Sequence, residues 1–142
     1  MAMLDRLRNY LGLVRFAHTV FALPFALMSA LVAARGFPSL PVTGWILFCM
    51  VTARTSAMTF NRIVDRNLDR LNPRTRGRHL PTGRVSLAEA TGLWIASSAL
   101  FVWGAWQLNP LAFSLSPLAL LIIGGYSFCK RFTALSHLVL GL

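Results

Sequence analysis

Acidic residues are scarce in this chain of 142 residues. Asp5, Asp65, Asp69 and Glu89 are the four, against 14 lysines and arginines, which gives a formal net charge of +10. Charged residues of both signs make up 13% of the chain, while hydrophobic residues make up 56%. These proportions lie outside the range of soluble globular domains. They exclude that class and indicate a membrane protein.

Cysteine is also nearly absent. Cys49 lies in the middle of one apolar stretch and Cys129 near the end of another. Neither has a second Cys or a His at the spacing that metal ligands require. The sequence therefore predicts no disulfide and no zinc site.

Long uncharged stretches show where the chain crosses the membrane. Residues 16–34 and 36–53 are two such stretches, and residues 90–129 contain no Asp, Glu, Lys or Arg. Because a spanning helix takes roughly 20 residues, the longest stretch must form two helices, with Asn109-Pro110 as the turn. We therefore predict an all-α, polytopic membrane helical bundle. Its spans are expected at about residues 16–34, 42–66, 88–108 and 111–129.

A further apolar segment, residues 132–142, follows Lys130-Arg131 and ends with the chain. It is too short to span, and a half-length apolar helix at a chain terminus is poorly satisfied in the bilayer. We therefore expect a truncated chain, residues 1–142 being the N-terminal part of one longer transmembrane domain. Residues 132–142 would begin a fifth span; a short re-entrant or interfacial helix is the alternative.

The basic residues follow the membrane topology. One side of the membrane receives the basic residues before residue 16, those from Arg62 to Arg84 and Lys130-Arg131. The other side receives Arg35. The positive-inside rule places the basic side in the cytoplasm. We expect a cytoplasmic N-terminus, a cytoplasmic loop at residues 67–86 and no nucleic acid as a partner. A signal-peptide core has about 7 to 15 residues, so the longer first apolar stretch is predicted to be a retained helix.

Two local patterns flank these spans. Residues 1–15 carry apolar side chains at spacings of three and four, which predicts an amphipathic surface helix leading into the membrane. Ser86 with Glu89 three residues later is a capping-box pattern, which predicts that a helix begins there.

Asn61, Asp65 and Asp69 follow one another at spacings of four residues. On a helix they lie within about 80° of one another, so they place oxygen ligands on one stripe. Mg²⁺ prefers such oxygens and usually binds through one or two carboxylates plus substrate phosphates. Alternatively, Arg62 and Arg66, each three residues before an Asp, form ordinary surface ion pairs with them. Spacing alone leaves both interpretations open.

Arg54 lies seven residues before Asn61, on the same helical face and deeper in the membrane. A charge at that depth predicts a functional site, because a bound anion or a polar cavity relieves its cost. Departure of a diphosphate from an allylic carbon needs Mg²⁺ and fixed cations to stabilise the leaving oxygens. The candidate cations are Arg54, Arg78, Lys130 and Arg131. Topology alone would explain every cation outside the span, but not Arg54.

These motifs resemble a known family. Asn61-x-x-x-Asp65-x-x-x-Asp69, followed by Asn72-Pro-Arg-Thr75 and Arg78-His-Leu-Pro-Thr-Gly83, is similar to the first aspartate-rich motif and hydrophilic loop of the UbiA superfamily of intramembrane aromatic prenyltransferases. The similarity extends to residues 15–24 and 126–133. Within the superfamily the chain looks most like the 4-hydroxybenzoate polyprenyltransferases.

The resemblance implies a helical bundle around a central cavity in the bacterial inner membrane, where a polyprenyl group passes from polyprenyl diphosphate to an aromatic acid acceptor in quinone biosynthesis. It implies Asn61 and Asp65 as Mg²⁺ ligands with Asp69 supporting them. Arg78 and Lys130 would contact the diphosphate, and Tyr126 would line the cavity. Asp65, Asp69 and Lys130 are thus the expected catalytic residues, and Arg54, Arg78, Tyr126 and Arg131 the expected substrate-binding ones.

Two departures from the family pattern matter. Arg62 stands where many relatives have Asp, and a second aspartate-rich motif is absent from these 142 residues. We therefore expect the chain alone to be inactive. One alternative is a small oligomeric multi-span transporter that uses Asp65 and Asp69 as a cation path. Another is a membrane-tethered binder of nucleic acid or anionic lipid that uses the loop from Arg62 to Arg84.

Overall fold

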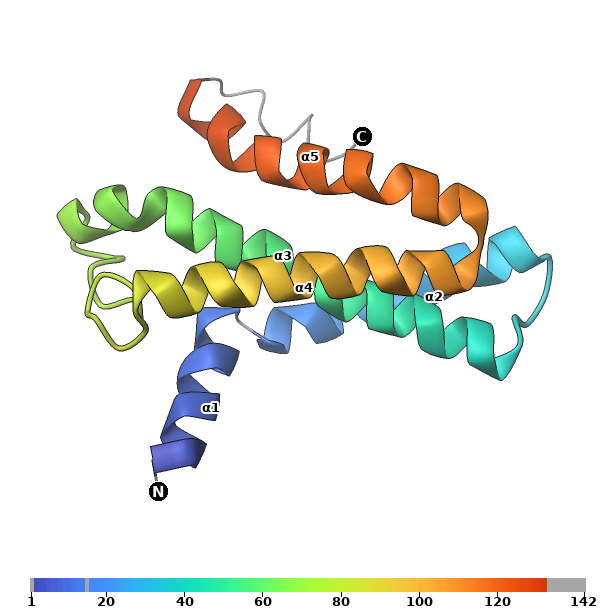
Figure 1. Ribbon diagram of the computed structural model, residues 1–142, viewed down its shortest axis with the longest axis horizontal. Helices are drawn as coiled ribbons and strands as arrows, with labels where there is room; N and C mark the ends of the chain where they lie inside the picture. Colours follow the sequence, from blue (N-terminus) through green and yellow to red (C-terminus); the bar gives the residue numbers. More distant parts are fainter. Residues whose placement is uncertain (1, 15, 133–142) are drawn as a thin grey trace.

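The computed structural model describes residues 2–14 and 16–132, and within them it contains five α-helices and no strand. Figure 1 shows α3 and α4 side by side, with α2 and α5 beside them and α1 leaving the bundle at a steep angle. Residues 133–142, most of the predicted fifth span, lie outside the described residues. The helices are α1 (Ala2–Leu13), α2 (Phe16–Ala34), α3 (Leu40–Leu71), α4 (Leu87–Leu108) and α5 (Pro110–Phe132).

Small residues let α3 and α4 approach each other closely. The hydroxyl groups of Ser56 and Ser98 lie 2.7 Å apart across the interface. Gly104 of α4 faces Phe48 and Cys49 of α3, and a Cβ at this position would lie 2.8 Å from Phe48 Cδ1 and 2.9 Å from Cys49 Sγ. Close packing of this kind is how membrane helices associate, because lipid is as apolar as their side chains.

The ends of α4 follow from local side-chain signals. The capping box of Ser86 and Glu89 is present, with the Ser86 hydroxyl accepting from the Glu89 N–H and the Glu89 carboxylate accepting from the Ser86 N–H. At the other end, Asn109 Oδ1 accepts a hydrogen bond of 2.7 Å from the N–H of Ala112 and so caps α5. Pro110 is the first residue of α5, where its missing N–H costs nothing. The predicted helix start and the predicted turn are both confirmed.

Helix α3 is longer than predicted at its C-terminal end. It continues to Leu71, so the loop begins at residue 72 rather than at residue 67. The helix ends there because Asn72, which precedes Pro73, is extended (φ −90°, ψ 120°), as residues before proline usually are. Its N–H still donates to the Leu68 carbonyl. The last turn of α3 therefore carries Asp69 beyond the predicted end of the span and into contact with the loop.

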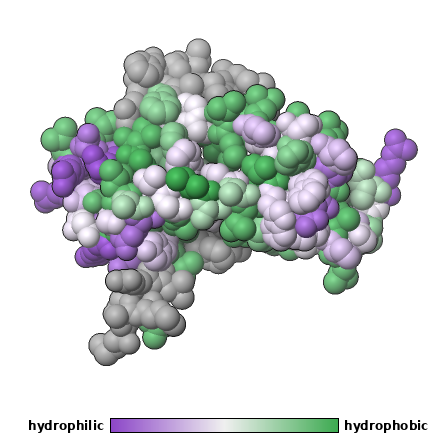
Figure 2. Space-filling model, in the orientation of Figure 1, coloured by the Kyte–Doolittle hydropathy of each residue, from purple (hydrophilic) through white to green (hydrophobic). Residues whose placement is uncertain are grey.

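Among the described residues, α4 and the part of α5 from Pro110 to Phe128 are long and apolar enough to cross a membrane. The apolar part of α2, Leu23–Ala34, is shorter. Large apolar side chains on α4 and α5 are exposed, among them Ile95, Trp106 and Leu121. Such a surface suits lipid and not water. Figure 2 shows this apolar middle, with hydrophilic residues gathered at the two ends of the long axis.

Candidate functional site

A cavity of about 470 Å³ lies between the middle of α3 and the C-terminal part of α5. Its polar groups include Arg54 and Asn61 from α3 and Tyr126 from α5. Arg54 and Asn61 line the same cavity, as their spacing of seven residues predicts. The remaining lining residues are Met50, Ala53, Ala57, Met58, Ile123 and Ser127. The cavity thus combines mostly apolar walls with a few polar groups, which is the usual make-up of a site for an amphipathic ligand.

Arg54 has a buried Nε atom that makes no hydrogen bond within the described part of the chain. A guanidinium nitrogen removed from water without an acceptor is costly. An anionic ligand in the cavity would supply the missing acceptor, and arginine offers a planar fork that matches carboxylate or phosphate oxygens. Arg54 therefore gives this cavity a buried N–H donor without an acceptor among the described residues.

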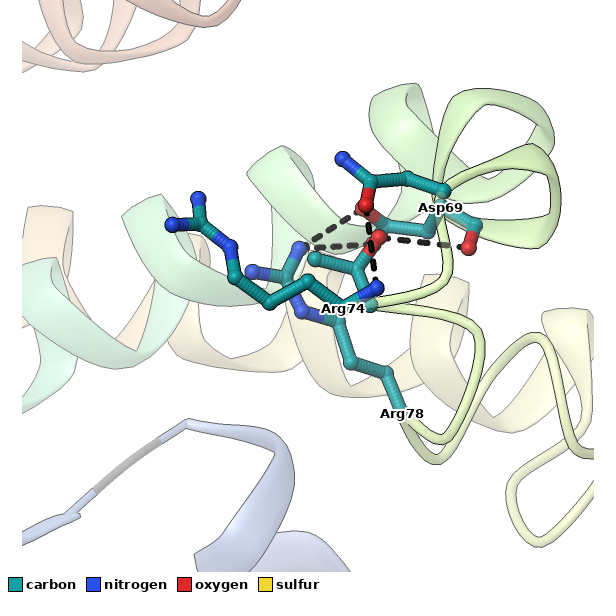
Figure 3. Close-up of polar contacts among 5 residues, drawn as sticks. Asp69, Arg74 and Arg78 are labelled. Atoms are coloured by element: carbon teal, nitrogen blue, oxygen red, sulfur yellow. Dashed lines mark hydrogen bonds and ion pairs between the residues drawn. The ribbon is translucent and has the colours of Figure 1, made fainter.

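Asp69 turns toward the loop and forms an ion pair with Arg78. Arg78 Nη1 donates to Asp69 Oδ1 at 2.7 Å and to Oδ2 at 2.8 Å, and the Thr75 hydroxyl donates to the Asp69 carbonyl at 3.2 Å (Figure 3). Asp69 is buried, with a relative exposure of 5%. The Asn72 side chain tightens the same turn by accepting from the N–H of Arg74 at 3.0 Å. The loop is therefore fixed to the end of α3 by side-chain contacts.

The predicted stripe is thus divided between two surroundings. Asn61 lines the cavity with Arg54, Asp69 holds the loop, and Asp65 lies between them and is buried, with a relative exposure of 7%. The 80° spread of the stripe is enough to separate its two ends. Sequence reasoning missed Thr75, although the Asn72-Pro73 turn signal ahead of it indicates a tight turn that brings its hydroxyl back to Asp69.

The oxygen groups at the end of α3 fit a hard divalent cation in their chemistry. No group of three or more His, Cys, Asp and Glu residues gathers anywhere in the described part of the chain. Two carboxylates and a carboxamide on one helix match instead a Mg²⁺ ion that takes most of its ligands from phosphate and water. Both oxygens of Asp69 accept from Arg78, while Asn61 lines the cavity of Arg54 and Asp65 lies one turn further along α3. Asn61 and Asp65 are therefore the residues that would hold the ion next to this cavity, as the resemblance implies.

Tyr126 lines the cavity, as the resemblance implied. Lys130 and Arg131 lie on the last turn of α5, but their side chains lie outside those the structure describes. Their roles in diphosphate binding remain predictions. Ser127, which also lines the cavity, is a polar group that the sequence did not single out.

An all-helical bundle with long apolar helices, an amphipathic cavity and an acidic helix end next to a basic loop is the architecture of an intramembrane protein. Within that class, the profile of the UbiA prenyltransferase family matches residues 22–142. The chain belongs to this family. The resemblance expected from the sequence is thereby confirmed, and so is the fold.

Named relatives and solved structures agree with this assignment. The chain is 37% identical to a 4-hydroxybenzoate octaprenyltransferase of Shewanella sediminis over 97% of its own length and 49% of that protein. The chain is 35% identical to a 4-hydroxybenzoate octaprenyltransferase of Paraburkholderia xenovorans, over 99% of this chain and 50% of that protein. The chain spans about half the length of the curated relatives it matches.

Two solved structures share the fold. The apo structure of a UbiA homologue from Aeropyrum pernix matches with a TM-score of 0.82 and 43% identity, over 88% of this chain and 45% of that one. A digeranylgeranylglyceryl phosphate synthase structure matches with a TM-score of 0.88 over 96% of this chain and 49% of that one. At 20% identity the second match shows a shared fold and nothing further.

Proposed function

We propose that this chain serves the transfer of a polyprenyl group from polyprenyl diphosphate to an aromatic acid, 4-hydroxybenzoate being the favoured acceptor, in quinone biosynthesis at the bacterial inner membrane. The observation that carries the proposal is the cavity in which Arg54, Asn61 and Tyr126 meet between apolar walls. Family membership and the names of the relatives support the same reaction class. The positive-inside distribution of arginines supports a cytoplasmic N-terminus.

The lining of the cavity matches the chemistry of this donor. Met50, Met58 and Ile123 offer apolar surface to the prenyl chain, while Arg54 offers a cation to an acidic group. Asn61 and Asp65 would hold Mg²⁺, which supplies positive charge to the departing diphosphate. In the reaction the allylic C–O bond breaks, a C–C bond forms at the ring carbon ortho to the phenol, and the ring loses a proton.

Arg78 can join the diphosphate site by changing partners. Its Nη1 now serves both oxygens of Asp69, and the side chain remains 28% exposed. A diphosphate that arrives beneath the loop would compete with Asp69 for this guanidinium, because phosphate oxygens accept equally short charge-assisted hydrogen bonds. The exchange would tie the loop to the ligand and leave Asp69 available to support the cation.

The described residues give no particular support to the transporter alternative. A cation path needs carboxylates deep in the membrane, whereas Asp65 and Asp69 lie on the last two turns of α3, next to the loop. The expected inactivity of the chain alone also remains a proposal. For this reason donor binding, and not turnover, is the appropriate test.

The test measures Mg²⁺-dependent binding of geranylgeranyl diphosphate to the 142-residue protein in neutral detergent micelles. The proposal predicts saturable binding that weakens tenfold or more in Asp65→Ala and when EDTA removes Mg²⁺. Arg35→Gln, which removes one charge at the opposite end of the bundle, should bind the donor as the unchanged protein does. Equal binding by Asp65→Ala and the unchanged protein would overturn the proposal.

A further inference from the structure

A second cavity lies between the end of α1, the inner part of α3 and the loop that follows α3. Its volume is about 670 Å³, and it shares no lining residue with the cavity of Arg54. We call it the α1–loop cavity. Its lining residues are Gly12, Leu13, Arg62, Arg74, Thr75, Gly77, Arg78 and His79. Three arginines and one histidine therefore line this cavity, and no carboxylate is among the lining residues, although Arg78 is already paired with Asp69.

Specific packing holds the α1 wall of this cavity in place. Leu13 is 1% exposed and packs in one cluster with Leu80, Val85 and Ala90. Gly12 lies directly against the imidazole of His79: a Cβ on Gly12 would lie 2.6 Å from His79 Cε1 and 2.8 Å from Nε2. The approach of α1 to the loop thus depends on the absence of a side chain at position 12.

A hydrogen bond extends the contact between α1 and the bundle. The Tyr10 hydroxyl donates to Glu89 Oε1 at 3.3 Å, and Glu89 also closes the capping box of α4. Helix α1 and the loop, which bound the α1–loop cavity, are therefore both attached to the bundle, α1 through Leu13 and Tyr10 and the loop through Arg78.

The electrostatic surroundings of the cavity favour an anion. Arg62 is buried, at 8% relative exposure, and Figure 2 shows hydrophilic residues gathered at the end of the molecule that carries the loop. Burial lowers the pKa of His79, and repulsion by Arg84 and Arg62 lowers it further. Burial is the larger cause and says nothing about the potential, but the contribution of Arg84 and Arg62 indicates a positive potential at the imidazole. Arginine pairs with phosphate oxygens through two parallel hydrogen bonds, so clustered arginines select for phosphate.

We propose that the α1–loop cavity is a second anion site, which binds a phosphate group without Mg²⁺. The phosphate can belong to the headgroup of an anionic lipid or to free inorganic diphosphate, since both present the same oxygens to the arginines. Lipid would reach the cavity along the membrane surface on which α1 is expected to lie, and inorganic diphosphate from the cytoplasm. The two cavities share no lining residue, but Arg78 lines this one and is also the arginine that the proposed function brings to the donor diphosphate. The inference therefore rests on Arg62, Arg74 and His79, which have no part in the proposed donor site.

The first experiment compares two arginines of the same loop. Both arginines are exposed, but Arg74 lines the cavity and Arg76, two residues further on, does not. Inorganic diphosphate is titrated into the 142-residue protein in neutral detergent with EDTA by calorimetry. In a second arm, native mass spectrometry compares retention of phosphatidylglycerol with retention of phosphatidylcholine.

Saturable binding is expected in one arm or both, and the arm identifies the source of the phosphate. Arg74→Gln should weaken it at least fivefold, while Arg76→Gln, with the same change of net charge, should leave it within twofold. Absence of saturable binding in both arms would overturn the proposal. Equal weakening by the two variants would do so as well, because it would show general surface attraction.

Two further variants separate this site from the donor site. Gly12→Leu places a side chain where His79 lies and should reduce anion binding at least fivefold, with the helical circular dichroism retained. Asp65→Ala should leave Mg²⁺-free anion binding unchanged. Loss of that binding in Asp65→Ala would place the anion in the donor site and contradict a separate cavity. Failure of prenyl donor binding alone would leave these results intact.

Discussion

One nitrogen of Arg78 donates to both carboxylate oxygens of Asp69, at 2.7 and 2.8 Å, across nine residues of sequence. This ion pair joins the last turn of α3 to the loop that covers it. Asp69 is nearly buried and Arg78 is 28% exposed, so the pair is protected from water on one side only. The loop therefore has one strong attachment that a phosphate ligand could take over.

Removing this ion pair should loosen the loop. Arg78→Gln leaves the buried Asp69 carboxylate without its charged donor, which costs about 1.5–3 kcal/mol for a hydrogen bond to a charged group. We expect faster limited proteolysis within residues 72–86 and a lower midpoint of thermal unfolding in detergent. Arg76→Gln, which changes an exposed arginine of the same loop, is the control. Identical proteolysis of both variants would show that the ion pair does not hold the loop.

Gly104 should tolerate no side chain, because a Cβ there would lie 2.8 Å from Phe48 Cδ1 and 2.9 Å from Cys49 Sγ. Gly104→Ala is expected to destabilise the packing of α3 on α4 by about 1–3 kcal/mol, as overpacking generally does. Gly92→Ala on the same helix is the matched control, since nothing lies within 4 Å of its Cβ position. That variant should be neutral or stabilising by up to about 1 kcal/mol. Thermal unfolding of the two variants side by side measures the difference.

The capping box at the start of α4 should be worth about 1 kcal/mol, within the usual range of 0.5–2 kcal/mol. Ser86→Ala removes the hydroxyl that accepts from the Glu89 N–H. Thr91→Ala is the control, because its hydroxyl bonds only the Leu87 carbonyl of its own helix among the contacts observed. Chemical denaturation in detergent should show a loss of stability for Ser86→Ala beyond that of Thr91→Ala. The same loss in both would contradict a specific role for the cap.

Acidification should destabilise the contact between α1 and the loop. The pKa of His79 is lower in the folded protein than its ordinary value of 6.5, so the unfolded chain binds the proton more readily. Stability should be complete above about pH 6.5 and decline as the pH falls through that value toward the lower pKa of the folded state. His79→Gln should flatten this part of the profile of unfolding midpoint against pH. A wild-type profile that is already flat from pH 7 to 5 would contradict the assignment.

Local signals account for what the sequence could predict. The ends of α4 and the turn at Asn109-Pro110 depend on side chains that cap the backbone within three residues, so they can be recognised without any knowledge of the fold. The shared face of Arg54 and Asn61 likewise follows from helical periodicity. Apolar runs placed the helices within a few residues, except at the C-terminal end of α3.

Contacts that depend on the path of the loop could not be predicted. The partner of Asp69 is nine residues away and is reached only after the turn at Asn72 reverses the chain. The contact of Gly12 with His79 joins residues 67 positions apart, and no spacing rule connects them. The division of the Asn61 to Asp69 stripe between a cavity and a loop has the same origin. It is set by what packs against α3, not by α3 itself.

The central claim is that the prenyl donor occupies the cavity between α3 and α5. The most direct measurement uses a prenyl diphosphate analogue with a photoreactive group on its chain, crosslinked to the protein in the presence of Mg²⁺ and mapped by mass spectrometry. The account predicts crosslinks to Met50, Met58 or Ile123, which line the cavity, and their loss when unlabelled geranylgeranyl diphosphate competes. Crosslinks confined to exposed residues of α4, such as Ile95 and Leu100, would show that the chain lies in lipid and would contradict it.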